Sequence, residues 1–360
     1  LDSKLNVRGI GQQEFTQHFP KAGLVEHDLK EIWDTTERCI ARALKQAKAK
    51  GTEIAAIGIT NQRETTGLWT TAGKPIHRAI VWQDRRTSEL CQELKAKGEE
   101  ARVKQTTGLV LDPYFSGTKL KWLLDNVKGA RLMAECGELK FGTIDTWLVF
   151  KMTGGAVHVT DASNASRTLL MNLETLTWDD AMLSLFDVPR SVLPRIAGSA
   201  ELYGVTRGMK SLPDGVPVSG IAGDQQAALF GQACFDPGEA KCTYGTGAFL
   251  LMNVGTSPVQ SKAGLLSTVA WKLGDTTTYA LEGSSFIAGA AVQWLRDGLG
   301  LIKKASDVEA LAKTVKSSGA VVFVPALAGL GAPHWRPDAR GLFAGIDRST
   351  TKGHLARAVL

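Results

Sequence analysis

The spacing of apolar positions along the chain predicts strands that alternate with helices. One face of residues 28–48 is apolar at a four-residue spacing, which predicts an amphipathic helix with Asp28 as its N-cap. Apolar runs at residues 54–60 and 217–222 predict buried strands, and a looser alternation over residues 5–15 predicts a strand or a hairpin.

The alternation of strands and helices starts again after residue 232. The second cycle contains predicted strands, a glycine-containing turn and two helices: strands 239–243, 249–254, 277–282 and 321–325, turn 245–247, and helices 287–297 and 354–360. Strands that alternate with helices indicate the α/β class. A chain of 360 residues is also long for one ordinary core, so we expect two domains, 1–232 and 233–360.

Composition and charge narrow the class of protein. With 44% hydrophobic and 22% charged residues, the chain has the composition of a soluble globular protein. The net charge of +6 is scattered without the basic stripe that duplex binding needs, which argues against a nucleic-acid partner. No apolar run has the length of a membrane span, and the first residues do not form a signal peptide.

The cysteines and histidines give no sign of a disulfide framework or a metal site. The five cysteines are odd in number and contain no CxxC pair, which favours reduced thiols and a cytoplasmic location. The six histidines are dispersed and no HExxH motif is present, so no metal site built by protein side chains is predicted.

A polar motif, N-Q-R-E-T-T, follows the predicted strand at residues 54–60. In open α/β sheets, ligands bind outside the carboxyl ends of the strands. Arg63 offers a fork of donors and Glu64 offers only acceptors, a combination that suits a small molecule rich in hydroxyl groups. The alternative is an ordinary surface loop with a solvated ion pair.

Two further motifs carry candidate ligand-binding side chains. Tyr114, in D-P-Y-F-S-G-T-K, either presents its phenol to a ligand or packs where the next helix begins. Asp224, in G-D-Q-Q, follows the predicted strand at 217–222 and precedes a helix. It is either a helix N-cap or a carboxylate base that accepts a proton from an attacking alcohol, with Gln225 orienting the hydroxyl.

A phosphate-binding turn is predicted in the second half. Gly245 and Thr246 belong to a G-T-G turn, whose backbone N–H groups suit phosphate oxygens, although an ordinary hairpin turn has the same pattern. Gly289 and Gln293 share one helix face, which approaches either a nucleotide or another helix. Neither a Walker A loop nor a GxGxxG motif is present.

Taken together and in order, the motifs resemble the FGGY carbohydrate kinases, and within that family the kinases that act on glycerol. The matching segments are I-T-N-Q-R-E-T-T, V-W-Q-D-R-R, D-P-Y-F-S-G-T-K, G-D-Q-Q-A-A-L-F-G-Q, T-Y-G-T-G-A-F and Q-W-L-R-D. The segment that begins at Tyr114 matches one family signature, and those that begin at Gly341 and His354 match most of a second. The resemblance covers essentially the whole chain.

The resemblance implies two ribonuclease-H/actin-like ATPase domains on either side of a cleft. It implies transfer of the ATP γ-phosphoryl group to glycerol, giving sn-glycerol 3-phosphate in the first step of glycerol catabolism, with Mg²⁺ neutralising charge. The residues that it implies for glycerol are Arg63, Glu64, Trp82, Tyr114, Asp224, Gln225 and Phe249, with Asp224 as the general base. Those that it implies for ATP are Gly245, Thr246, Gly289 and Gln293.

The resemblance also implies segments that the printed sequence does not contain. Family members have a strand and a D-Q-G-T-T-S-x-R phosphate loop before the position of Leu1, and a glycine-rich adenine-binding segment after the position of Leu360. We therefore expect the 360 residues alone to be inactive. A homo-oligomer, dimer or tetramer, is expected by analogy with the family.

Two alternatives remain open at this stage. One is a sister kinase that acts on a pentulose or another polyol, although the aromatic residues Trp82, Tyr114 and Phe249 favour a short triol. The other is a non-catalytic ligand-binding or regulatory protein on the same scaffold.

Overall fold

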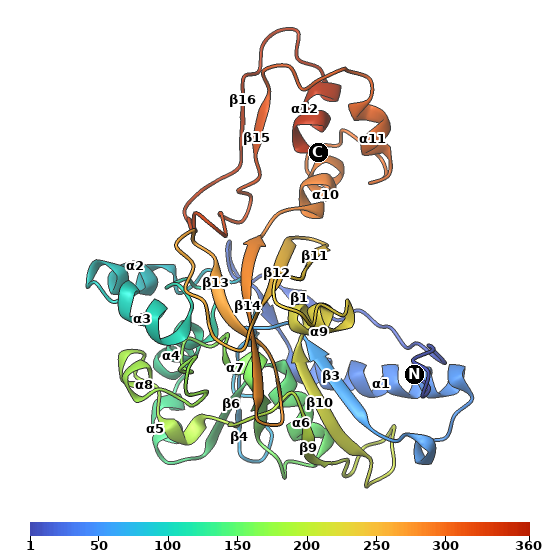
Figure 1. Ribbon diagram of the computed structural model, residues 1–360, viewed down its shortest axis with the longest axis vertical. Coiled ribbons are helices and arrows are strands. Elements are labelled where there is room, and N and C mark those ends of the chain that lie inside the picture. Colours follow the sequence, from blue (N-terminus) through green and yellow to red (C-terminus); the bar gives the residue numbers. More distant parts are fainter.

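The computed structural model describes residues 1–360 (Figure 1). The α-helices, in chain order, are α1 Leu29–Ala47, α2 Ser88–Ala96, α3 Glu100–Thr107, α4 Ser116–Asn126, α5 Ala130–Glu135, α6 Ile144–Met152, α7 Ala162–Ala165, α8 Asp180–Leu185, α9 Asp224–Gly231, α10 Gly289–Asp297, α11 Asp307–Ala312 and α12 Lys352–Val359. None of these helices has the length and apolar character needed to cross a bilayer.

The strands form six small sheets. Three sheets have more than two strands: β1 (Gln17–His18), β2 (Glu26–His27) and β5 (Ala79–Ile80); β3 (Ile57–Asn61), β10 (Pro217–Gly223) and β9 (Ala200–Val205); β11 (Ala240–Tyr244), β12 (Ala248–Gly255), β14 (Thr276–Ser285) and β13 (Leu266–Leu273). The two-stranded sheets pair β4 (Gly67–Thr70) with β6 (Leu139–Gly142), β7 (Val159–Asp161) with β8 (Arg195–Ala197), and β15 (Val322–Val324) with β16 (Leu342–Ala344).

The parallel pair β3 and β10 brings two motif-bearing strand ends to one edge. Ile59 pairs with Ile221 and Asn61 pairs with Gly223, so both strands finish at the same level. The chain therefore continues from β3 into Arg63 and from β10 into Asp224 at neighbouring positions.

The antiparallel sheet β11–β12–β14–β13 packs against the first part of the chain. In Figure 1 it lies between α1–α8 at one end of the molecule and the group formed by α10, α11, α12, β15 and β16 at the other. The largest core cluster contains 33 buried residues and joins Leu266, Val269 and Tyr279 of this sheet to side chains such as Leu109 and Phe115. This shared core fixes the second sheet against the strand ends that carry the site.

Helix α1 confirms the prediction of an amphipathic helix with Asp28 as its N-cap. The Asp28 carboxylate accepts hydrogen bonds from the backbone N–H groups of Lys30, at 2.7 Å, and Glu31, at 3.2 Å, as an N-cap should. Leu29 and Ile32 are buried in a second core cluster with residues of β3, α6 and β10.

The predicted strand or hairpin at residues 5–15 is wrong. This segment has no strand partner and instead runs beside α1, where Arg42 donates to the carbonyl oxygen of Gln12 at 3.0 Å. A side chain at Gly9 or Gly11 would collide with the backbone of α1. Alternating polarity is also what an extended segment shows when one of its sides lies on a helix.

A polar cluster is buried beneath the end of β3. Asp145 has no exposed surface and accepts hydrogen bonds from the hydroxyl groups of Thr143, at 2.5 Å, and Thr160, at 2.7 Å. Burial, and after it the charge of Asp161, raises the pKa of Asp145 from 3.8 to about 6.

Candidate functional site

The residues after β3 turn sharply, so that Arg63 and Glu64 both line one pocket. Glu64 has a φ of +59°, in the left-handed region that a residue with a side chain rarely occupies. Successive side chains on a regular strand point to opposite faces, and this turn removes that alternation. Both side chains are almost completely buried, with 2% and 1% exposure, so the alternative of a solvated surface ion pair is wrong.

The pocket gathers side chains from five separate parts of the sequence. Its volume is about 50 Å³, and it is lined by Gln62, Arg63, Glu64, Trp82, Tyr114, Asp224, Gln225 and Phe249. All seven residues that the sequence predicted for a polyol therefore lie around one small cavity. Their individual roles in binding remain predictions.

Aromatic rings form the apolar side of this pocket. The ring of Trp82 meets those of Tyr114 and Phe249 edge to face, with centroids 5.8 Å and 6.1 Å apart. Tyr114 both packs and presents its phenol, because its ring is buried while its hydroxyl oxygen accepts a hydrogen bond from Arg63 at 3.2 Å. Burial raises the pKa of Tyr114, so the hydroxyl keeps its proton and has it available for a ligand.

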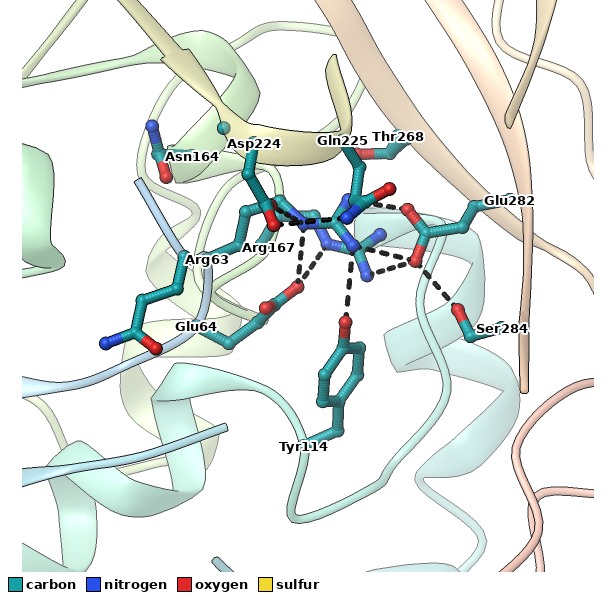
Figure 2. A network of polar contacts seen from close by, with 12 residues as sticks. Arg63, Glu64, Tyr114, Asn164, Arg167, Asp224, Gln225, Thr268, Glu282 and Ser284 are labelled. Atoms are coloured by element: carbon teal, nitrogen blue, oxygen red, sulfur yellow. Dashed lines mark hydrogen bonds and ion pairs between the residues drawn. The ribbon is translucent and has the colours of Figure 1, made fainter. Parts of the chain in front are cut away.

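A buried ionic network supports the polar side of the pocket (Figure 2). The carboxylate of Glu282, on β14, accepts hydrogen bonds from Arg63 at 2.5 Å and 3.0 Å and from Arg167 at 2.9 Å. Arg167 also donates to Glu64 at 2.6 Å, and the hydroxyl of Ser284 donates to Glu282 at 2.9 Å. Two buried arginines and two buried carboxylates thus neutralise one another.

The two buried carboxylates respond differently to this environment. Burial opposes ionisation of Glu282, but the charges of Arg167 and Arg63 outweigh it and lower its pKa to about 2. Burial raises the pKa of Glu64, and the same two arginines offset that only in part. The physical reason is contact: Glu282 accepts three hydrogen bonds from the arginines, whereas Glu64 accepts one and lies 3.6 Å from Nε of Arg63.

Asp224 is not a helix cap. Helix α9 has Gly223 at its N-cap position, and Asp224 is the first helical residue, with no side-chain cap hydrogen bond. Its carboxylate instead lies 3.6 Å from Nε of Arg63 and accepts a hydrogen bond from the Gln225 amide at 3.1 Å. The side chain is 44% exposed and lines the pocket. The N-terminus of a helix also favours a negative charge at this position.

The residues predicted for a nucleotide lie together at a second place. The N–H of Gly289 donates to the carbonyl oxygen of Gly245 at 2.9 Å, and that of Ala288 donates to Thr246 at 2.8 Å. Gly289 is the first residue of α10, so the helix begins two residues later than the predicted start at residue 287. A Cβ atom there would come within 2.6 Å of the Gly245 oxygen, which explains the glycine. Thr246 and Gln293 are exposed, and their role remains a prediction.

The turn and the pocket are joined through β11 and β12. Tyr244 pairs with Ala248 on either side of the turn, and Phe249 follows directly in β12. A phosphate held at the turn would therefore approach the pocket from the side of Phe249.

Sequence reasoning missed Gln62 in the pocket lining and three residues that support the pocket: Arg167, Glu282 and Lys241. Lys241 is buried and donates to the Gln225 side chain at 2.5 Å. Arg167 offered the best signal, because it is a charged residue in a run of small, hydroxyl-bearing and apolar residues, A-S-N-A-S-R-T-L-L. Charged residues are almost never fully buried unless they are paired.

The side chains alone do not build a metal centre. No group of three or more His, Cys, Asp or Glu residues is arranged to hold a metal ion. A divalent cation at this site would need most of its ligands from elsewhere.

In a comparison with known proteins, both halves of the chain match domains of one protein family. Residues 1–231 match the N-terminal domain of the FGGY family of carbohydrate kinases, and residues 240–360 match the C-terminal domain. A glycerol kinase of Myxococcus xanthus is 72% identical over 363 residues, covering 100% of this chain and 73% of the relative. A glycerol kinase of Deinococcus radiodurans is 59% identical, covering 100% of this chain and 72% of the relative.

Solved structures of related kinases have a similar fold. The structure of Plasmodium falciparum glycerol kinase with ADP superimposes with a TM-score of 0.84 at 40% identity, over 96% of this chain and 70% of that chain. A gluconate kinase from Lactobacillus acidophilus superimposes with a TM-score of 0.82 at 25% identity, over 96% of this chain and 69% of that chain.

Proposed function

The chain belongs to the FGGY family of carbohydrate kinases, and from this premise we propose that it phosphorylates glycerol with ATP to give sn-glycerol 3-phosphate. The two-domain α/β kinase fold expected from the motifs is confirmed by the family matches and the TM-score of 0.84. A relative that is 72% identical is named for glycerol, and a related enzyme was solved with ADP, which supports the choice of acceptor and donor.

The observation that carries this proposal is the size and lining of the pocket. A single water needs roughly 10–15 Å³ of cavity, so the pocket of about 50 Å³ suits a ligand of a few heavy atoms. Arginine and carboxylate groups face aromatic rings across it, as a short polyol with hydroxyl groups on a carbon chain requires. A pentulose is larger and would have to extend beyond these walls.

The proposed reaction uses Asp224 as the general base. Its carboxylate accepts the proton from a terminal hydroxyl of glycerol as that oxygen bonds to the γ-phosphorus and the bond to the β,γ-bridging oxygen breaks. Arg63 holds the acceptor, while the turn at Gly245 and the start of α10 face the phosphates. Catalysis then comes mainly from positioning the two reactants.

The proposal includes a metal ion, a location and an assembly. Mg²⁺ would arrive with the ATP phosphates, since it usually keeps water and phosphate ligands and few protein ones. A cytoplasmic location is supported by five free cysteines without a disulfide. A homo-oligomer, dimer or tetramer, is proposed from family resemblance.

A panel of acceptors tests the substrate. The intact protein should turn over glycerol with ATP at least tenfold more efficiently, as kcat/KM, than erythritol, xylulose or ribulose. Strong turnover of a ketose without turnover of glycerol would establish the sister-kinase alternative instead.

Substitution of Asp224 tests the mechanism. Asp224→Ala should bind glycerol with little change, while kcat falls by about two to four orders of magnitude because the proton acceptor is lost. Asp236→Ala, at an exposed aspartate, is the matched control. If Asp224→Ala phosphorylates glycerol near the wild-type rate, Asp224 is not the base.

A further inference from the structure

Lys241 lies outside the pocket lining but contacts three residues at its edge. It extends from β11 with only 7% exposure. Its ammonium group donates to Oε1 of Gln225 at 2.5 Å, to the hydroxyl of Thr243 at 2.9 Å and to the carbonyl oxygen of Phe249 at 3.3 Å. All three donors of the ammonium are therefore used, and two of the partners line the pocket.

The contact with Lys241 determines which way the Gln225 amide faces. An ammonium group has no acceptor, so it must meet the amide oxygen and not the amide nitrogen. The nitrogen then points to the other side, where it donates to Oδ2 of Asp224 at 3.1 Å. With the amide reversed, the oxygen would face the carboxylate of Asp224 and both contacts would be lost.

The charges around Lys241 come from every element packed against it. Glu282 on β14 and Asp224 on α9 favour its cationic form, as does the neighbouring Cys242, whereas Arg63 opposes it. Burial lowers the pKa of Lys241 to about 8, so it remains mainly a cation at neutral pH. The ammonium therefore stays available to hold the oxygen of the Gln225 amide.

We propose that Lys241 is a positioning residue which, acting through the Gln225 amide, orients the carboxylate of Asp224 and keeps it ready to accept a proton. The same ammonium holds the backbone of Phe249, whose ring forms a wall of the pocket. This role rests on the proposed phosphorylation of glycerol. It also connects the proton acceptor to the strand that leads into the turn at Gly245.

The test compares Lys241→Met with wild type and with Lys272→Met. Methionine keeps the length and loses the charge and the donors; Lys272, on β13, is half-buried and makes no side-chain hydrogen bond. Lys241→Met should lower kcat/KM for glycerol about 10- to 100-fold, as expected for losing a charged hydrogen bond. The loss should fall on kcat, with KM for ATP unchanged. Lys272→Met should change neither.

A double-mutant cycle separates positioning from simple support of the fold. If Lys241 acts through Gln225, then Lys241→Met should have little further effect on kcat/KM in a Gln225→Leu background. If the Met variant does not fold, Lys241→Gln, which keeps a polar end group, takes its place in the same measurements.

Three results would overturn the proposal: an unchanged kcat/KM in Lys241→Met, additive losses in the cycle, or a rise confined to KM for ATP with kcat unchanged. The last would mean that Lys241 contacts phosphate. Failure of the wild-type protein to phosphorylate glycerol would refute the proposed function itself, which is a separate outcome.

Discussion

Glu282 offers a direct test of whether the buried ionic network organises the pocket. Glu282→Gln keeps the size of the side chain but removes one of the two carboxylates that neutralise Arg63 and Arg167. A neutral amide has one acceptor oxygen where the carboxylate has two, and its N–H₂ group would face a guanidinium. The variant therefore leaves two buried cations with a single buried carboxylate, Glu64.

The expected loss of stability is large. Removing one partner of a fully buried ion pair destabilises a protein by about 3–5 kcal/mol, because the remaining charge is left uncompensated. The loss also has a characteristic pH dependence. The pKa of Glu282 is lowered to about 2 from 4.5, so its contribution to stability is fully present above pH 4.5 and is lost as the pH falls towards 2. Glu282→Gln should lack this part of the acid sensitivity.

Urea unfolding measures the loss of stability. Calorimetric titration with glycerol measures the affinity of the pocket for its ligand. Glu309→Gln is the matched control, because Glu309 pairs with Lys313 on the exposed side of α11 and its loss should be indistinguishable from wild type. Glycerol affinity should fall in Glu282→Gln but not in the control, since Arg63 loses its orientation. An unchanged unfolding free energy, or normal glycerol affinity in a destabilised protein, would refute the role given to Glu282.

Three further outcomes are expected. Burial raises the pKa of Asp145 from 3.8 to about 6, so ionisation of this side chain reduces stability as the pH rises through that range. The free energy of unfolding of Asp145→Asn should therefore gain up to about 3 kcal/mol on wild type between pH 4 and pH 7. Urea unfolding at the two pH values measures this difference. Gly289→Ala should raise KM for ATP about tenfold and leave glycerol binding unchanged, because the new Cβ would press on the backbone of Gly245. Tyr114→Phe keeps the buried ring and loses the hydroxyl, so KM for glycerol should rise about tenfold, and stability should fall by about 1–3 kcal/mol because a buried donor of Arg63 loses this partner.

The parts of the site that follow strand ends were predictable from the sequence. Arg63 and Asp224 each come directly after an apolar run, and parallel strands bring such positions to one edge. The motifs then supplied the remaining lining residues by resemblance. No local pattern shows that Asp224 is not the N-cap, because an aspartate at the start of a helix usually caps it. The structure shows it, because Gly223 takes the N-cap position of α9.

The supporting residues were not predictable in the same way. Arg167 and Glu282 are 115 positions apart in the sequence, and their contact depends on how β14 packs against the first half of the chain. The same holds for Lys241 and Gln225, which come from a strand and a helix on either side of a loop. Periodicity describes which face of one element is buried and says nothing about which distant element covers it.

The backbone and the side chain of Glu64 place different requirements on the residue at this position. Glycine would adopt this conformation without strain, whereas any other residue costs on the order of 1 kcal/mol or more there. A glycine, however, would remove the carboxylate that Arg167 and the pocket use. Without it, the two buried arginines would be left with Glu282 as their one fully buried carboxylate partner. The strain of the backbone at Glu64 is therefore tolerated because the charge of this side chain is needed inside the network.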